Sequence, residues 1–238
     1  MKNKKEIVIS VGYTAIMAAA MATAYHIFGY KYSDVGINNI LVYFEAVMTS
    51  YALFLYMKFY KGKAYHKIRI TPWLIAYSFI ILVIAVLFVL QKGYLENSDI
   101  FIKAFITTIF IAISEESIYR GIVLQGFLEN NSKTKAIIFS AILFALLHVV
   151  NVFAGFEVSS IGVQLLNTFV HGIAIGCLMV LTRNLIPFIV FHFIWDLVML
   201  SSSFVEHNIL IILIMLLTEA VFAVSLLRLI YKEDKKHN

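Results

Sequence analysis

The 238-residue chain has little charge for its length. Only 14% of its residues are Asp, Glu, Lys or Arg, whereas 61% are hydrophobic. Ordinary globular domains contain roughly 25% charged residues and about 45–50% apolar ones. The shortage of charge therefore indicates an integral membrane protein. No polar stretch is long enough for a second domain, so residues 1–238 are expected to form one integral membrane domain.

Cysteine and proline are also scarce. The one cysteine, Cys177, lies within an apolar run, which excludes an intrachain disulfide and a thiolate metal cluster. The two prolines, Pro72 and Pro187, each stand near the start of an apolar run, where the first turn of a helix tolerates proline. The net charge of +5 comes from basic residues scattered over short segments. Such scatter favours a cytoplasmic membrane face and no nucleic-acid partner.

Long apolar runs are abundant. A helix that spans the bilayer needs about 20 mostly apolar residues. The sequence predicts an all-α polytopic membrane protein with eight transmembrane helices, of which the second and the seventh are short. The predicted spans are 7–28, 40–57, 72–91, 100–127, 135–151, 161–182, 185–201 and 208–230.

The distribution of Lys and Arg predicts how these spans are oriented. With both termini in the cytoplasm, the cytoplasmic segments hold fifteen Lys and Arg residues and the opposite segments hold three. This bias follows the positive-inside rule and requires an even number of spans. We therefore expect a multi-pass protein with N-in/C-in topology. The composition, rich in Lys, Asn and Ile, suggests a bacterial plasma membrane.

Three charged residues lie halfway along the fourth run: Glu115, Glu116 and Arg120. Each charge at that depth costs at least ~3 kcal/mol, so internal partners are expected. Glu116 and Arg120 are four residues apart on one helix face and can pair. Glu115 is rotated by about 100° from Glu116 and is free to face a cavity.

Polar residues from two other spans are predicted at the same depth. Counting at 1.5 Å per residue from the cytoplasmic ends places Glu115, His148 and Asp196 roughly 16–20 Å deep. His192 lies one turn from Asp196 on the same face, so the two present one edge. Two carboxylates and two imidazoles are thus expected to meet within the membrane.

This set of residues can support two kinds of hydrolysis. In the first, Glu115 is the general base for a water that His148 also holds, while His192 and Asp196 stabilise an oxyanion. In the second, the histidines and a carboxylate hold zinc, which activates the water. The sequence has no H-E-x-x-H motif, so the zinc site lacks its usual local signal. The residues alone leave both alternatives open.

The same residues resemble the motifs of a known family. Glu115–Gly121 is similar to an E-E-x-x-x-R motif, Phe144–His148 to F-x-x-x-H, and His192–Asp196 to H-x-x-x-N/D. Together, over about residues 100–200, they resemble the CPBP intramembrane proteases. That family includes the type II CAAX prenyl endopeptidases and the Abi bacteriocin-processing and immunity proteins.

The resemblance implies an intramembrane endopeptidase that acts on a membrane-associated peptide or protein. It implies that Glu115 and His148 activate water, that His192 and residue 196 form the oxyanion site, and that Glu116 and Arg120 support them. Many members carry Asn where this chain has Asp196, and an ionised Asp cannot donate a hydrogen bond. No cofactor is required by this interpretation, although zinc is possible.

Two other classes of function remain as alternatives. A non-catalytic immunity or partner-binding protein can share the same scaffold. A proton-coupled transporter is disfavoured because the chain shows no inverted repeat. Neither the leaflet to which the site opens nor the natural substrate follows from the sequence.

The remaining intramembrane polar residues and glycines are interpreted structurally. His171 is expected to donate a hydrogen bond between helices, and Glu45 and Glu219 to position helices or form local bonds. Gly172 and Gly176 form a small-x-x-x-small pair, which predicts close helix packing.

Overall fold

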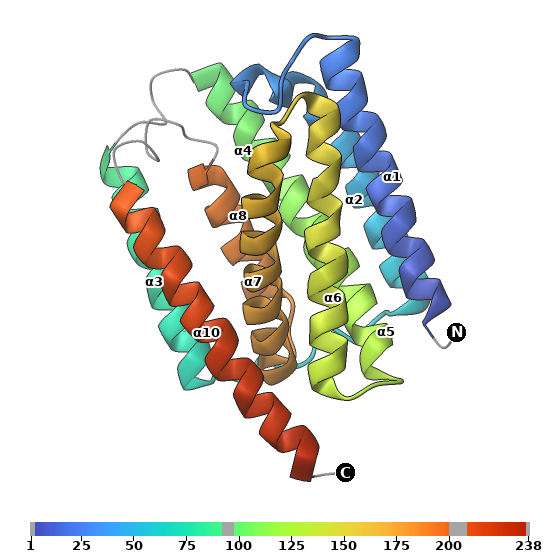
Figure 1. Cartoon of the computed structure of the whole chain (residues 1–238), viewed down its shortest axis with the longest axis vertical. Helices are drawn as coiled ribbons and strands as arrows, with labels where there is room; N and C mark the ends of the chain where they lie inside the picture. The colour runs from blue at the N-terminus through green and yellow to red at the C-terminus, as the bar shows by residue number, and fades with distance from the viewer. Residues whose placement is uncertain (1–2, 92–97, 200–208, 237–238) are drawn as a thin grey trace.

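The computed structural model describes residues 3–91, 98–199 and 209–236, and this part of the chain forms a bundle of eight helical rods (Figure 1). Apart from one isolated bridge, between Tyr65 and Asn184, these residues form no β-structure. The helices are α1 (Lys4–His26), α2 (Asn38–Phe59), α3 (Pro72–Gln91), α4 (Ser98–Glu116), α5 (Leu124–Leu128), α6 (Lys133–Leu147), α7 (Val158–Thr182), α8 (Ile186–Met199) and α10 (Ile209–Lys236).

The helices confirm the predicted all-α membrane architecture. Within the described residues, six helices are long and apolar enough to cross a membrane, and α8 is a shorter apolar helix. The remaining rod joins α4 to α5 and carries the charged motif. Pro72 begins α3 and Pro187 lies in the first turn of α8, as the sequence predicted. The second predicted span is wrong in one respect, because α2 has 22 residues and is not short.

Both termini lie at the same end of the bundle (Figure 1). An even number of rods requires this arrangement. The connection from α1 to α2 and the connection from α6 to α7 both lie at the opposite end (Figure 1). We refer to these two ends as the terminus end and the far end.

Helices α6 and α7 pack closely through glycine. A Cβ atom on Gly172 would lie 2.9 Å from the Cβ of Ala141 and 3.0 Å from its Cα. A Cβ atom on Gly176 would lie 3.1 Å from the Cγ2 of Ile137. These distances leave no room for larger side chains, so the predicted packing role of the two glycines is confirmed.

Two rods change their hydrogen-bonding pattern next to the charged motifs. The rod that begins as α4 continues as a π-helical segment, Ser117–Val123, all of whose residues are buried. The rod that begins as α6 continues as a 3-10 segment, His148–Ala154. Short π segments inside α-helices frequently occur at functional sites. The irregular segments thus identify the level of the bundle at which the polar side chains gather.

Candidate active site

Glu116 and Arg120 form a buried ion pair. The Oε1 atom of Glu116 lies 3.1 Å from Nη1 of Arg120, and the two side chains are 0% and 1% exposed. This contact confirms the pairing predicted from their spacing. The Arg120 guanidinium also lies 4.1 Å from the ring centroid of Phe144, in a cation–π contact. The π-helical segment that carries Arg120 is therefore tied both to α4 and to α6.

His192 lies among three carboxylates. Its Nδ1 atom is 2.9 Å from Oε1 of Glu116, and its Nε2 atom is 3.3 Å from Oδ2 of Asp196. The same Nε2 atom is 3.7 Å from Oε2 of Glu115. The structure thus brings together four of the predicted site residues, and the edge shared by His192 and Asp196 is present. With Nδ1 donating to Glu116, the ring is held so that Nε2 faces Glu115 and Asp196.

The bond from His192 to Glu116 is a feature that the sequence analysis missed. Glu116 was expected only as a partner of Arg120, yet it lies between the guanidinium and the imidazole. Glu116 and His192 are 76 residues apart, so no local spacing could reveal the contact. Only the way α4 and α8 pack against each other brings them together.

His148 lies on the same cavity but approaches it differently. Its Nδ1 atom is 3.3 Å from the carbonyl oxygen of Phe144, and its ring centroid is 5.4 Å from that of Phe144. The Phe144 ring is in turn 6.1 Å from the His192 ring. Among the described residues, no carboxylate lies within ion-pair distance of His148. With Nδ1 donating to the backbone, Nε2 is left to bind a water or a substrate.

A cavity of ≈ 780 Å³ joins these side chains. Its lining includes Glu115, His148, His192 and Asp196 at its inner end, and it extends to Ser33 and Asp34 at the far end of the bundle. Pockets of about 300–1,000 Å³ hold small ligands, so a cavity of this size can admit several residues of a peptide. Its walls mix apolar side chains with amides and hydroxyls, which can pair with a peptide backbone.

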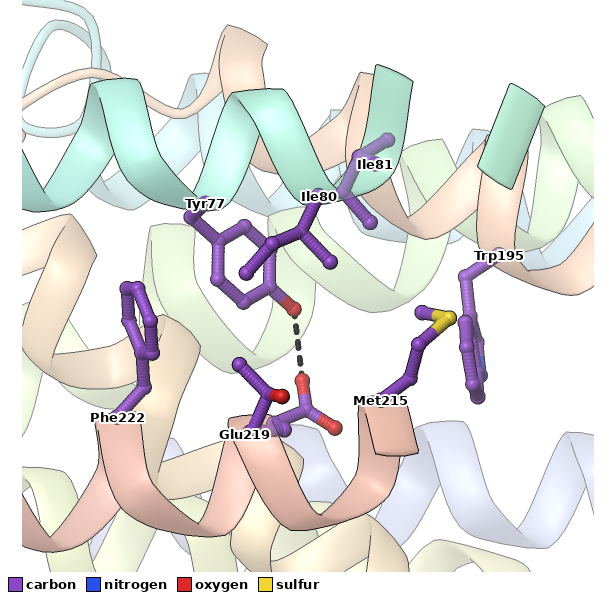
Figure 2. A pocket seen from close by; sticks show the side chains of 8 residues that line it. Tyr77, Ile80, Ile81, Trp195, Met215, Glu219 and Phe222 are labelled. Carbon is purple, nitrogen blue, oxygen red and sulfur yellow. Dashed lines mark hydrogen bonds between the residues drawn. The ribbon is translucent and has the colours of Figure 1, made fainter. Parts of the chain in front are cut away.

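A second cluster of polar side chains borders the cavity. The sequence analysis did not predict that its members contact one another. His171 Nδ1 lies 2.6 Å from Oε1 of Glu219, and the hydroxyl of Tyr77 donates to the same oxygen at 2.7 Å (Figure 2). His171 therefore bonds between helices, as expected, and Glu219 is the partner. The rings of His171 and His192 are 6.0 Å apart. Helices α3, α7 and α10 thus share one polar contact beside the candidate site.

A small pocket of ≈ 20 Å³ lies beside this group (Figure 2). Tyr77, Trp195 and Glu219 are among its lining residues, and Trp195 and Glu219 also line the large cavity. The volume is sufficient for about one water molecule. Glu219 thus lies between the large cavity and a small, mostly apolar gap next to α3.

Glu45 forms a third buried polar contact, behind the site. Its Oε2 atom is 3.5 Å from Oγ of Ser114, and that hydroxyl is 2.7 Å from the hydroxyl of Tyr13. Within the described part of the chain, the other carboxylate oxygen of Glu45 has no hydrogen-bond partner. The predicted bonding role of Glu45 therefore takes the form of a contact between α2 and α4.

The histidines and carboxylates of the candidate site were also the predicted zinc ligands. Among residues 3–91, 98–199 and 209–236, no group of three or more His, Cys, Asp or Glu side chains is placed to hold a metal ion. A zinc site takes three or four such ligands around one point. Here both ring nitrogens of His192 face carboxylates, and Nδ1 of His148 faces a backbone carbonyl.

The comparison with family models gives a match that contains the candidate site. Residues 97–198 match the model described as Rce1-like, type II CAAX prenyl endopeptidase. This is the family that the three motifs predicted. The Rce1-like segment contains all six predicted site residues and covers a little under half of the chain. No curated protein and no solved structure matches the chain.

The Rce1-like match supports an intramembrane endopeptidase in general, acting on peptides within a membrane. Together with the apolar helices, it supports a multi-pass membrane protein. It does not assign a role to any one side chain. The chemistry of the site has to be argued from the contacts of Glu115, His148, His192 and Asp196.

Proposed function

We propose that this protein hydrolyses a peptide bond of a membrane-associated peptide or small membrane protein, with Glu115 as the general base. The observation that carries the proposal is the contact of His192 Nε2 with Glu115 and Asp196 at the inner end of a peptide-sized cavity. A base and a hydrogen-bond donor then lie side by side where a carbonyl group can enter. General acid–base catalysis requires groups within about 3 Å of the reacting atoms or one water away.

In the proposed reaction, a water lies between Glu115 and His148. Glu115 takes a proton from this water as its oxygen bonds to the peptide carbonyl carbon, which gives a tetrahedral oxyanion. The carbon–nitrogen bond then breaks, and Glu115 returns the proton to the leaving amine. Both groups line the cavity, and no side chain among the described residues bonds to Nε2 of His148, which supports its role in holding the water.

His192 is proposed to stabilise the oxyanion. An imidazolium can donate from both ring nitrogens, and the bond from Nδ1 to Glu116 favours that charged form. Nε2 then donates toward the oxyanion, which is most effective in a site from which water is excluded. Asp196 is proposed to orient Nε2, because its Oδ2 atom lies 3.3 Å from that nitrogen. The ion pair of Glu116 and Arg120 holds the arrangement in place.

The decisive experiment is cleavage of a labelled membrane peptide by the purified protein in lipid vesicles. Glu115→Gln is expected to lower kcat by about 10²–10⁴-fold, the usual contribution of a general acid–base group. The matched control is Glu233→Gln, because Glu233 forms a half-exposed ion pair with Lys133 at the terminus end of the bundle, away from the cavity. Wild-type turnover by Glu115→Gln would contradict the proposed role of this residue.

The same assay separates the two ways of activating water. We propose a mechanism that requires no cofactor, so activity is expected to persist in the presence of a strong chelator. Loss of activity with chelator that zinc restores would instead favour a zinc-dependent protease. If a biological immunity function persists in Glu115→Ala and His148→Ala, a non-catalytic, partner-binding role would replace the enzyme.

A further inference from the structure

The cavity that holds the candidate site opens toward one end of the bundle. Its lining comes mainly from the C-terminal parts of α1, α6 and α8, from the N-terminal parts of α2, α7 and α10, and from the last turns of α4. In Figure 1 the C-terminal ends of α1, α6 and α8 and the N-terminal ends of α2, α7 and α10 lie toward the far end of the bundle. Ser33, Asp34 and Ser159, which line the cavity there, are exposed. The mouth of the cavity therefore lies at the far end.

The terminus end is closed by a packed apolar layer. Ile118, Ile122, Leu185 and Phe188 are each at most 1% exposed. In the same layer, a Cβ atom on Gly121 would already lie 3.1 Å from the ring of Tyr56, so the π-helical segment packs closely against α2 there. A peptide or a water molecule can thus reach Glu115 from the far end but is separated from the terminus end by this layer.

Basic residues mark the terminus end as cytoplasmic. The start of α1, the connections from α2 to α3, from α5 to α6 and from α7 to α8, and the end of α10 lie there. Together with the flanking helix turns, these segments carry most of the Lys and Arg residues. At the far end, the described basic residues are Lys31 and Lys103, and Lys103 donates to Asn39. Segments rich in Lys and Arg stay in the cytoplasm when membrane proteins insert. The mouth of the cavity consequently faces the other side of the membrane.

The wall between the mouth and the site carries a chain of polar groups. Gln164 donates to the hydroxyl of Tyr32 at 3.2 Å, and Asn151 donates to Gln164 at 3.1 Å. All three side chains line the cavity. An extended peptide in a membrane has unpaired N–H and C=O groups, and each one needs a partner there. This polar wall provides such partners along the path from the mouth to His148.

We propose that the cavity admits its substrate from the non-cytoplasmic face of the membrane. The substrate class is then a peptide whose scissile bond lies in the outer half of the bilayer, such as a segment of an exported or membrane-anchored peptide. A peptide tail confined to the cytoplasm is excluded. The cleavage part of this inference rests on the proposed function, whereas the orientation of the mouth does not.

Cysteine labelling tests the orientation without any assay of activity. Cys177 is buried and is the only cysteine, so Cys177→Ala gives a cysteine-free background. Ser33→Cys and Ser159→Cys then report on the mouth, and Lys61→Cys, also exposed, reports on the terminus end as the matched control. A membrane-impermeant maleimide is expected to label the two mouth variants on intact cells and Lys61→Cys only after permeabilisation. The reverse pattern, or no labelling of the mouth variants before permeabilisation, would overturn the proposal.

A vesicle assay tests the substrate side and separates this inference from the proposed function. A membrane-anchored peptide added from outside is expected to be cleaved by right-side-out vesicles and not by inside-out vesicles. Glu115→Gln vesicles serve as the control for cleavage by this site. Cleavage by inside-out vesicles alone would overturn the inference and leave the protease intact. If wild-type vesicles of neither orientation cleave the peptide, the proposed function is overturned. The labelling result would still decide the orientation of the mouth.

Discussion

His192 is the residue on which the candidate site converges. Its ring contacts Glu116 through one nitrogen and Glu115 and Asp196 through the other. The side chain is buried, so these contacts are made where the local dielectric constant is low and charges interact strongly. An oxyanion donor in this position needs no rearrangement when the substrate enters.

Replacing His192 by Ala is expected to slow turnover strongly while the protein stays folded. Loss of one oxyanion donor lowers kcat by about 10²–10³-fold in known hydrolases. Cleavage of the membrane peptide and size-exclusion profiles in detergent measure the two effects. The control is His66→Ala, because His66 is exposed at the terminus end. Wild-type rates with His192→Ala would remove the ring from the mechanism.

Glu116→Gln is expected to destabilise the fold as well as the site. The substitution leaves the fully buried Arg120 without a countercharge, and breaking a buried ion pair costs about 3–5 kcal/mol. Thermal unfolding in detergent measures the loss of stability. Glu233→Gln breaks the ion pair with Lys133, whose side chains are 41% and 42% exposed, and should cost at most about 1 kcal/mol. Equal effects of the two substitutions would contradict the structural role of the buried pair.

At the scale of single elements, two irregular segments place the site. The π-helical segment Ser117–Val123 follows directly after Glu115 and Glu116, and the 3-10 segment begins at His148. Each change of helix type alters the direction of the side chains that follow it. Arg120 is thereby brought over the ring of Phe144. Close packing of α6 against α7 then fixes the positions of two helices that line the cavity.

Gly172→Ala is expected to destabilise the pair of helices α6 and α7. The new methyl group would lie 2.9 Å from Cβ of Ala141 and 3.0 Å from its Cα, so backbone has to move. Overpacking of this kind costs about 1–3 kcal/mol. Gly162→Ala is the matched control on the same helix, because a Cβ there meets nothing within 4 Å. Thermal unfolding in detergent should show a lower Tm for Gly172→Ala and no loss for Gly162→Ala; similar losses in both would contradict this packing role.

At the scale of the whole molecule, polar contacts join helices that are far apart in the chain. Glu219 on α10 accepts a bond from Tyr77 on α3 (Figure 2). It also contacts His171 on α7. Three rods are thereby fixed relative to one another next to the cavity. In lipid the hydrophobic effect contributes little to the association of helices. Polar contacts of this kind therefore help to specify which helices pack against one another.

Glu219→Leu is expected to loosen the contact of α10 with α3 and α7. His171 and Tyr77 would lose their partner inside the bundle, at a cost of about 1–3 kcal/mol for each buried polar group left unpaired. Thermal unfolding and protease sensitivity in detergent measure this change. Thr218→Val is the control on the neighbouring position, because the Thr218 hydroxyl bonds only to its own helix at Ile214. A Glu219→Leu protein as stable as the control would show that this contact does not hold the bundle together.

Features that depend on local spacing along the chain could be predicted before the fold was known. Apolar runs predicted the helices closely, because a span of the bilayer needs a fixed length of apolar chain. The spacing of four residues predicted the contacts of Glu116 with Arg120 and of His192 with Asp196. The three motifs predicted the family that residues 97–198 match.

The tertiary structure decided which helix faces meet. The bond from His192 to Glu116, the contact of His171 with Glu219, and the direction in which the cavity opens each depend on how rods rotate and pack. Helix periodicity fixes which residues share a face, but not which neighbour that face meets. That choice follows from side-chain packing between segments tens of residues apart, such as Gly172 against Ala141. For this physical reason, the members of the site could be read from the sequence, whereas their contacts and their access could not.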